Sequence, residues 1–242
     1  MDFLTIMISS VLCLSVAIFI AGLGFRIYTY SKTPAPLKIP TMPAPLTANG
    51  VRLRMFKEVV FFHSLFRANK WIWLFGWLFH LGMFLVLFRH LRYATEPVWD
   101  LVAIMQPIGV YMAFAMLIGL LGLWFRRIFV ERIRYITNPS DHIILALLSL
   151  IVITGLFMKY VSHIDIVQAK AFSLGLLYFD WQALPADFVF VIHLLLVAML
   201  LVIFPFSKLL HAPGVFFSPT RNQIDDAREK RHLAPWAAKL EK

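Results

Sequence analysis

The chain has 242 residues, of which 60% are apolar and 15% are charged, and its formal net charge is +10. A soluble domain usually carries about 25% charged residues, so this composition excludes an ordinary soluble globular protein. Nucleic-acid binding needs a soluble basic face, whereas the charges here lie in short blocks between long apolar runs, which excludes that class as well. With Cys13 as its single cysteine, the chain can build neither a disulfide framework nor an iron–sulfur cluster of its own.

Five apolar segments are long enough to cross a membrane, which takes about 20 residues because the hydrocarbon core is about 30 Å thick. We expect the spans at residues 3–27, 70–91, 101–126, 141–160 and 187–208. Apolar runs of this length are helical, since a membrane barrel uses short alternating strands. The predicted fold class is an all-α membrane protein, with a bundle of five transmembrane helices in one domain over residues 1–215.

The positive charges predict how the bundle is oriented. Residues 26–70 hold eight Lys and Arg residues, residues 126–141 hold four and residues 207–242 hold seven, whereas residues 89–100 and 159–187 hold two each. Positive residues concentrate on the cytoplasmic side, so the N-terminus is expected outside, in the periplasm, and the C-terminus in the cytoplasm. The N-terminus has no basic region before its apolar run, so we expect a retained span rather than a cleaved signal.

Two polar segments are expected on the cytoplasmic side. Residues 29–56 are rich in proline and predict an extended arm, and residues 212–242 form a polar tail of mixed charge. Each is either a solvated linker facing lipid headgroups or a docking surface for a partner protein. On the outer side, the connection 161–187 contains the apolar sequence AFSLGLLYFDW, which predicts a short helix along the membrane interface.

Four histidines lie in or beside two of the spans, where ionisable side chains usually mark a site. His80 and His90 belong to the second span, and His193 and His211 lie near the two ends of the fifth. Because these spans run in opposite directions, His90 is expected to meet His193 on the outer side, and His80 to meet His211 on the inner side. The separations along the helices are about 15 Å and about 27 Å, so both pairs can form only if the helices tilt or Pro205 bends the fifth.

Two imidazoles from opposite helices are what a six-coordinate haem iron requires. The pattern therefore predicts two b-type haems between the second and fifth spans, with Gly76 and Gly82 leaving room for the macrocycles. A single histidine of this kind would more often be a core residue bonded to a neighbouring helix. The alternative for the whole protein is a cofactor-free membrane anchor or transporter, in which the histidines relay protons or tie helices together.

Several other polar residues are candidates for supporting contacts on the inner side. His142 follows the sequence NPSD at the start of the fourth span and is expected to make a contact in the first turn of the helix or to a haem propionate, rather than to bind the iron. Arg126 and Lys208 are further propionate candidates, although positive residues flanking the spans explain them equally well.

Taken together, these features resemble a known family of membrane cytochromes b, which includes the gamma subunit of respiratory nitrate reductase. The resemblance rests on the five spans, the ten-residue spacing of His80 and His90, the eighteen-residue spacing of His193 and His211, and the sequence FPFSKLLH. The sequences FRHLRY, NPSDHIILALLSLIVITGLFMKY and FSLGLLYF are similar to the cytochrome b subunit (DsrM-type) of the Dsr membrane complex, which is associated with dissimilatory sulfite reductase. The resemblance implies an outer and an inner haem b on the four histidines. It also implies electron exchange between membrane quinone or quinol and a cytoplasmic iron–sulfur subunit.

The chain departs from the nitrate reductase subunit in its third span. That subunit carries an early lysine tied to quinol binding, whereas residues 101–125 hold no charged residue here. By position near the outer haem, the candidate quinone contacts are Arg89, Arg92, Tyr93 and Gln106. The two arginines are equally explained as anchors at the membrane interface. The expectation is an electron-transfer subunit of a redox complex in a bacterial or archaeal cytoplasmic membrane, and not a complete enzyme by itself.

Overall fold

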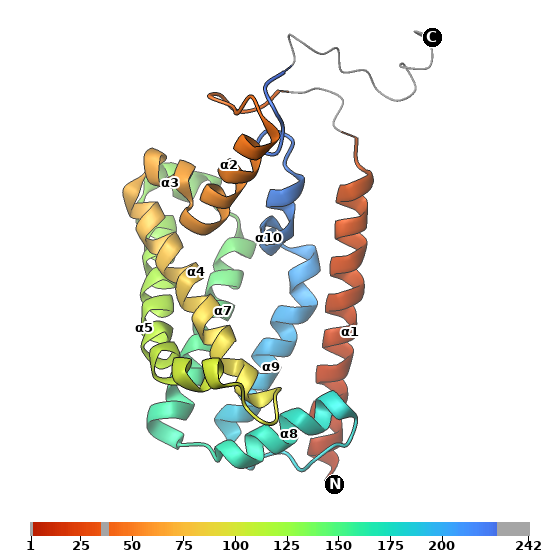
Figure 1. Ribbon diagram of the computed structural model, residues 1–242. Helices are drawn as coiled ribbons and strands as arrows, with labels where there is room; N and C mark the ends of the chain where they lie inside the picture. The colour runs from red at the N-terminus through yellow and green to blue at the C-terminus, as the bar shows by residue number, and fades with distance from the viewer. Residues whose placement is uncertain (1, 35–38, 227–242) are drawn as a thin grey trace, which may run out of the picture. The chain divides into compact units, whose positions relative to one another are not determined.

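The computed structural model describes residues 2–34 and 39–226, and every regular element in those ranges is a helix (Figure 1). Five of the helices are long and apolar enough to cross a membrane: Phe3–Lys32, Lys70–Tyr93, Asp100–Phe129, Pro139–Ser162 and Phe188–Phe206. The all-helical prediction with five candidate spans is therefore confirmed. The chain divides into two compact units, one containing the chain up to Phe19 and Asn69–Ile203, the other containing Ile20–Ala68 and the chain from Phe204.

The first unit is a series of neighbouring helices. Its long elements are the first part of α1 (Phe3–Lys32), α4 (Lys70–His90), α5 (Asp100–Phe129), α7 (Pro139–Phe157) and α9 (Phe188–Ile203). Helix α4 packs along α5, α5 against α7, and α7 against α9 (Figure 1). In the part of the chain that the structure describes, α4 and α9 are thus joined through α5 and α7 rather than by extensive packing of their own.

Two apolar clusters hold these helices together. One joins α4, α5 and α7 through Phe79, Met116, Leu120, Leu148 and Val152. The other joins α1 and α9 to the short helix α8 (Ile166–Tyr178) through Ile8, Leu12, Ala169, Phe172, Phe190 and Ala198. Helix α8 is the helix expected in the connection 161–187. It begins where the Asp165 carboxylate accepts hydrogen bonds from the Val167 and Gln168 amides, at 2.8 and 3.2 Å.

Glycines allow α4 and α5 to approach closely. A Cβ added to Gly119 of α5 would lie 2.7 Å from both the Phe75 carbonyl oxygen and the Phe79 nitrogen of α4. A Cβ on Gly82 would lie 2.7 Å from the Met112 carbonyl oxygen of α5. The expectation that Gly82 makes room for a macrocycle was therefore wrong. The lack of a side chain at Gly82 instead allows α4 to approach α5.

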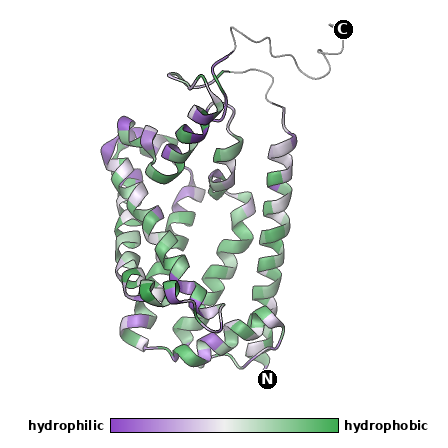
Figure 2. Ribbon diagram, viewed as in Figure 1, coloured by the Kyte–Doolittle hydropathy of each residue, from purple (hydrophilic) through white to green (hydrophobic). Residues whose placement is uncertain are grey.

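Most of the apolar surface of the first unit faces outward. Phe84, Leu87, Ile104 and Phe125 are among its exposed large apolar side chains. Figure 2 shows hydrophobic residues along most of the length of α4, α5, α7 and α9. Such a surface on helices of this length fits a lipid environment, and the protein is a multi-pass membrane protein.

The second unit contains the remainder of α1, with α2 (Ala48–Phe61), α3 (His63–Ala68) and the short helix α10 (His211–Gly214). An extended arm was expected over residues 29–56, but residues 29–32 continue α1 and residues 48–56 belong to α2. The reason is local, since the Thr47 hydroxyl accepts a hydrogen bond from the Gly50 amide at 3.1 Å and caps a helix-forming sequence. Residues 35–38 lie outside the described ranges.

The α-helical part of the fifth span ends just before Pro205. Helix α9 stops at Ile203, and 3-10 turns follow at Phe204–Phe206 and Lys208–Leu210. A proline cannot donate the helical hydrogen bond, and the carbonyl oxygen of buried Pro205 accepts one from Arg26 Nε at 3.2 Å. His211 consequently lies at the start of α10 and not on α9.

The beginning of the polar tail folds back on the second unit. Arg221 Nη1 lies 3.1 Å from Glu58 Oε2 and donates a hydrogen bond to the Ser64 hydroxyl at 2.9 Å. The Asp225 amide donates to the Pro45 carbonyl at 2.9 Å. These contacts attach the start of the tail to the segment around α2. The tail was predicted over residues 212–242, and residues 227–242 lie outside the described part of the chain.

The close approach of α4 and α5 leads to a stability prediction. We expect Gly119→Ala to lower the free energy of unfolding by about 1–3 kcal/mol, because the added methyl must push the two helices apart. The matched control is Gly24→Ala, where nothing lies within 4 Å of the added Cβ. Alanine has the higher helix propensity, so Gly24→Ala should be neutral or stabilising by up to about 1 kcal/mol. Thermal unfolding in detergent measures both, and equal melting temperatures would contradict the close contact.

Candidate functional site

The two histidines of α4 hold their rings in the same way. His80 Nδ1 lies 2.7 Å from the carbonyl oxygen of Gly76, and His90 Nδ1 lies 2.7 Å from that of Val86. A carbonyl oxygen can only accept, so each Nδ1 carries the proton and donates it to the preceding turn of the helix. In a neutral imidazole the lone pair is then on Nε2, the nitrogen that points away from that carbonyl.

His193 of α9 is held by another helix. Its Nδ1 lies 2.8 Å from the hydroxyl oxygen of Thr154 on α7. The Thr154 hydroxyl also lies 2.9 and 3.0 Å from the carbonyl oxygens of Leu150 and Ile151. The imidazoles of His193 and His90 are close enough to interact electrostatically. The first unit therefore brings these two rings near each other, while their pairing on one iron stays a prediction.

His211 belongs to the second unit and lines a cavity there. Its Nδ1 lies 2.9 Å from the carbonyl oxygen of Lys208, which can only accept, so Nδ1 carries the proton and donates it. The cavity has a volume of about 510 Å³. It is lined by Tyr30, Ser207, Lys208, Leu210, His211, Gly214 and Phe217. Lys208, predicted as a propionate contact, thus shares a cavity with the predicted ligand His211. The pairing of His211 with His80 stays a prediction.

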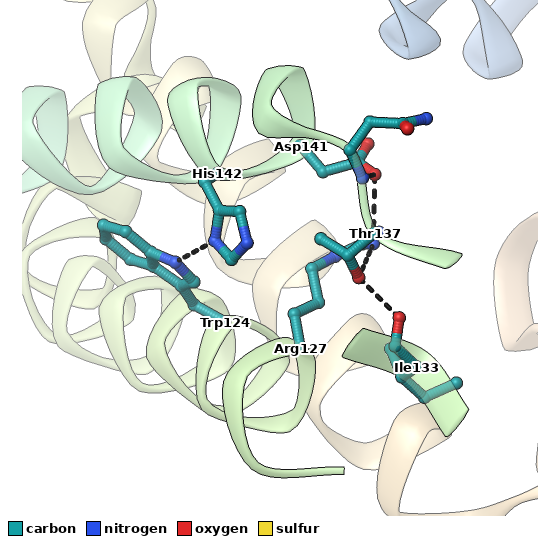
Figure 3. A network of polar contacts seen from close by, with 7 residues as sticks. Trp124, Arg127, Ile133, Thr137, Asp141 and His142 are labelled. Atoms are coloured by element: carbon teal, nitrogen blue, oxygen red, sulfur yellow. Dashed lines mark hydrogen bonds and ion pairs between the residues drawn. The ribbon is translucent and has the colours of Figure 1, made fainter. Parts of the chain in front are cut away.

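His142 has the opposite hydrogen-bond arrangement (Figure 3). Trp124 Nε1, which can only donate, lies 3.0 Å from His142 Nδ1. Nδ1 must therefore accept, and a neutral His142 carries its proton on Nε2. That nitrogen has no lone pair for a metal but can donate a hydrogen bond to a carboxylate. The role of His142 as a propionate contact rather than an iron ligand stays a prediction.

An ion pair beside His142 joins the end of α5 to the start of α7 (Figure 3). Arg127 Nη1 lies 3.4 Å from Asp141 Oδ2, and the Asp141 carboxylate, which is 5% exposed, also accepts from the Asn138 amide at 3.1 Å. Thr137 donates from its hydroxyl to the Ile133 carbonyl at 2.7 Å, which orders the intervening helix α6 (Glu131–Ile136). Arg126, the second predicted propionate contact of this unit, is half-buried in the same turn of α5.

The four candidate quinone contacts gather beside His90. Arg92 donates to the side-chain oxygen of Gln106 at 3.2 Å, and the Gln106 amide donates to the carbonyl oxygens of Arg89 and Val102 at 3.2 and 3.1 Å. The ring centroids of Tyr93 and His90 are 6.0 Å apart. The hydrogen bonds of the Gln106 side chain therefore join α5 to the end of α4.

Arg89 is the member of this group whose polar atoms are least satisfied by the described residues. Its Nε is buried without a hydrogen-bond partner there. The stem of the side chain lies on α5, since a Cβ on Gly109 would come within 2.8 Å of Arg89 Cδ. Gly109 thus makes the position of this side chain possible.

Sequence reasoning missed Thr154, Trp124 and Tyr30. Thr154 and Ser149 are the two hydroxyl side chains within the apolar run 143–157, and polar residues in spans are a usable signal. The partner of Thr154 on another helix was not predictable, because a nearly uniformly apolar span gives no indication of which side faces which neighbour. The same holds for the bond from Trp124 to His142.

Comparison with known proteins agrees with this architecture. Residues 62–225 match the nitrate reductase gamma subunit family. The chain is 37% identical to the Hdr-like menaquinol oxidoreductase cytochrome b-like subunit of Archaeoglobus fulgidus, over 92% of this chain and 81% of that protein. A protein of the same description from Archaeoglobus profundus is 32% identical, over 91% of this chain and 79% of its own length.

A third relative extends the similarity to bacteria. The respiratory nitrate reductase 2 gamma chain of Escherichia coli is 28% identical, over 62% of this chain and 76% of its own length. None of these three relatives is named for a Dsr complex, so that narrower assignment stays a prediction. The match over residues 62–225 and the 37% identity to the A. fulgidus subunit establish that this chain belongs to the nitrate reductase gamma subunit family of membrane cytochromes b.

Proposed function

We propose that this protein is the di-haem cytochrome b subunit of a membrane redox complex, and that it transfers electrons between quinone or quinol and an iron–sulfur partner. The observation that carries the proposal is how Nδ1 is held in four histidines. His80, His90 and His211 donate from Nδ1 to backbone carbonyls, and Nδ1 of His193 is held by Thr154. Metal-bound histidines typically donate their other ring nitrogen in this way, which leaves Nε2 for the metal.

The residues present fit haem b. Each haem takes two neutral imidazoles, and we assign His90 and His193 to the outer haem and His80 and His211 to the inner one. When bound, haem b supplies a reversible one-electron couple. The apolar helices α4 and α9, which are linked through α5 and α7, offer apolar walls for a haem. The cavity at His211 contains Lys208, which offers a cation for a propionate. His142 Nε2, Arg126 and Lys208 are the proposed donors to the propionates.

The quinone site is proposed beside His90, with Arg89 as its main donor. Arg92 and Gln106 hold each other in place, and Tyr93 lies against the His90 ring. A quinone carbonyl requires a donor, and the buried Nε of Arg89 lacks a partner among the described residues. The two Archaeoglobus relatives are named for a menaquinol oxidoreductase, which favours a menaquinol-type substrate here.

The partner is proposed to bind on the cytoplasmic side. The relatives are named as a subunit and a chain of larger enzymes, and the family resemblance implies an iron–sulfur protein as the neighbour. The segment around α2 and the start of the tail, joined by Arg221 and Glu58, provide a folded polar surface for such a partner. We place the protein in the cytoplasmic membrane of a bacterium or an archaeon, and we propose a role in sulfur metabolism from the resemblance to the Dsr complex.

The haem assignment predicts the effect of each histidine substitution. We expect about two haem b per chain in the purified protein, and about one in each of His80→Ala, His90→Ala, His193→Ala and His211→Ala, because each removes one axial ligand. The double variant of His90 and His193 should retain one haem, and that of His90 and His80 should retain none. A pyridine haemochrome assay together with the protein concentration gives these numbers.

Two histidine controls separate ligands from other roles. His163→Ala changes an exposed histidine outside the proposed sites, and His142→Ala changes a donor that has the opposite proton arrangement. Both should retain two haems. A folded wild-type protein that contains no haem, when haem is supplied during expression, would reject the proposal in favour of a cofactor-free anchor or transporter.

The orientation is tested with two single cysteines in a Cys13→Ser background. Val167 and Tyr135 are 78% and 91% exposed, and the positive-inside rule predicts α8 outside and α6 in the cytoplasm. A membrane-impermeant maleimide should therefore label Val167→Cys in intact spheroplasts and Tyr135→Cys only after lysis. The reverse pattern would invert the proposed positions of the quinone site and of the iron–sulfur partner.

A further inference from the structure

The ring of His193 is held by a side chain of another helix. His80, His90 and His211 donate to carbonyl oxygens three or four residues earlier in the chain. His193 instead reaches across to Thr154 of α7, 39 residues away in sequence, at 2.8 Å. The bond therefore depends on a side chain that can be changed without altering any backbone.

The direction of this bond follows from counting protons. The Thr154 hydroxyl has one proton, and two carbonyl oxygens of its own helix lie 2.9 and 3.0 Å away, where they can only accept. A threonine in a helix commonly donates to a carbonyl in the preceding turn. The lone pairs of Oγ then remain for an incoming donor, so Nδ1–H of His193 donates to Thr154.

The surroundings of the ring make this bond important. His193 is half-buried in an apolar span, where an unpartnered N–H is costly. The backbone of α7 also lies beside the ring, since a Cβ on Gly155 would be 3.6 Å from His193 Cε1. A π-helical turn, Met158–Ser162, follows one turn later and is of a kind that often occurs at functional sites.

We infer that Thr154 is a positioning residue for His193, which fixes the plane of the imidazole and strengthens Nε2 as a donor to iron. This inference rests on the proposed function. Donation of Nδ1–H to an oxygen increases electron density on Nε2, and a stronger donor stabilises the ferric more than the ferrous form. Thr154 therefore lowers the reduction potential of the outer haem through His193, without contacting the haem itself.

The test compares Thr154→Val with Thr154→Ser. Valine has nearly the shape of threonine but no oxygen, so His193 loses its hydroxyl acceptor and only the Ile151 carbonyl of α7 remains beside its ring. We expect Thr154→Val to raise the midpoint potential of one haem and to change the g-values of its low-spin ferric EPR signal. Thr154→Ser retains a hydroxyl and should keep the midpoint potential and the g-values of the wild type. The second haem should be unchanged in each variant.

A matched control excludes a general effect of the substitution. Thr29→Val removes a hydroxyl that likewise donates to its own helix, at 2.9 Å from the Phe25 carbonyl, and this bond involves no histidine. Its potentials and EPR spectra should equal those of the wild type. If Thr154→Val loses one haem, Thr154→Ser keeps it and Thr29→Val keeps both, positioning is supported in its stronger form. Equal changes in the two valine variants would reject it.

Failure of the inference can be told from failure of the proposed function. If His193→Ala retains both haems, His193 is not a ligand and the haem assignment is wrong, whatever Thr154 does. If His193→Ala loses one haem while Thr154→Val leaves both potentials and both EPR signals unchanged, the assignment stands and the role of Thr154 is rejected.

Discussion

A polar group inside a lipid bilayer must find its partner within the protein, and this constraint governs the arrangement of the histidines. The hydrocarbon core offers no water, so each ring N–H in a span has to be placed on a specific oxygen. His80 and His90 use the carbonyls of Gly76 and Val86, which the helix itself supplies at the right distance. Because the helix provides these acceptors at any position, the rings are oriented before any cofactor is present, and binding would not have to reorganise them.

The packing of α4 explains how this can happen on a helix that also carries the main helix–helix contact. Gly82 and Phe79 face α5, where glycine allows the backbones to approach. His80 is two residues from Gly82, about 200° around the helix axis, so it points away from that contact. One side of α4 is thus committed to α5, and another side remains available for the imidazole. The chain separates rigid packing from ligand binding within a single helix.

The sequence predicted the large elements and missed the contacts between them. Five long apolar runs predicted five helices, and the short helix α8 was visible in the connection 161–187, because length and hydropathy suffice for both. Residues 48–56 were misassigned, since the prolines before them outweighed the cap at Thr47. The role of Gly82 and the bond from Thr154 to His193 depend on how each helix is rotated about its axis. Helices that are apolar on all sides carry little information about that rotation.

The position of the proton on an imidazole separates a possible iron ligand from a possible propionate donor, which residue type alone does not. His80, His90 and His142 lie on apolar helices and His211 lies at the start of α10, and these positions alone do not separate an iron ligand from a hydrogen-bond donor. Trp124 does so for His142, because an indole can only donate and so leaves the proton on Nε2. Carbonyl oxygens do the reverse for the other three. A neighbour with one fixed hydrogen-bonding role therefore determines which imidazole can bind iron and which can bind a carboxylate. The same argument gives the direction of the bond between His193 and Thr154: the single hydroxyl proton of Thr154 is already donated within α7, so Thr154 accepts from His193.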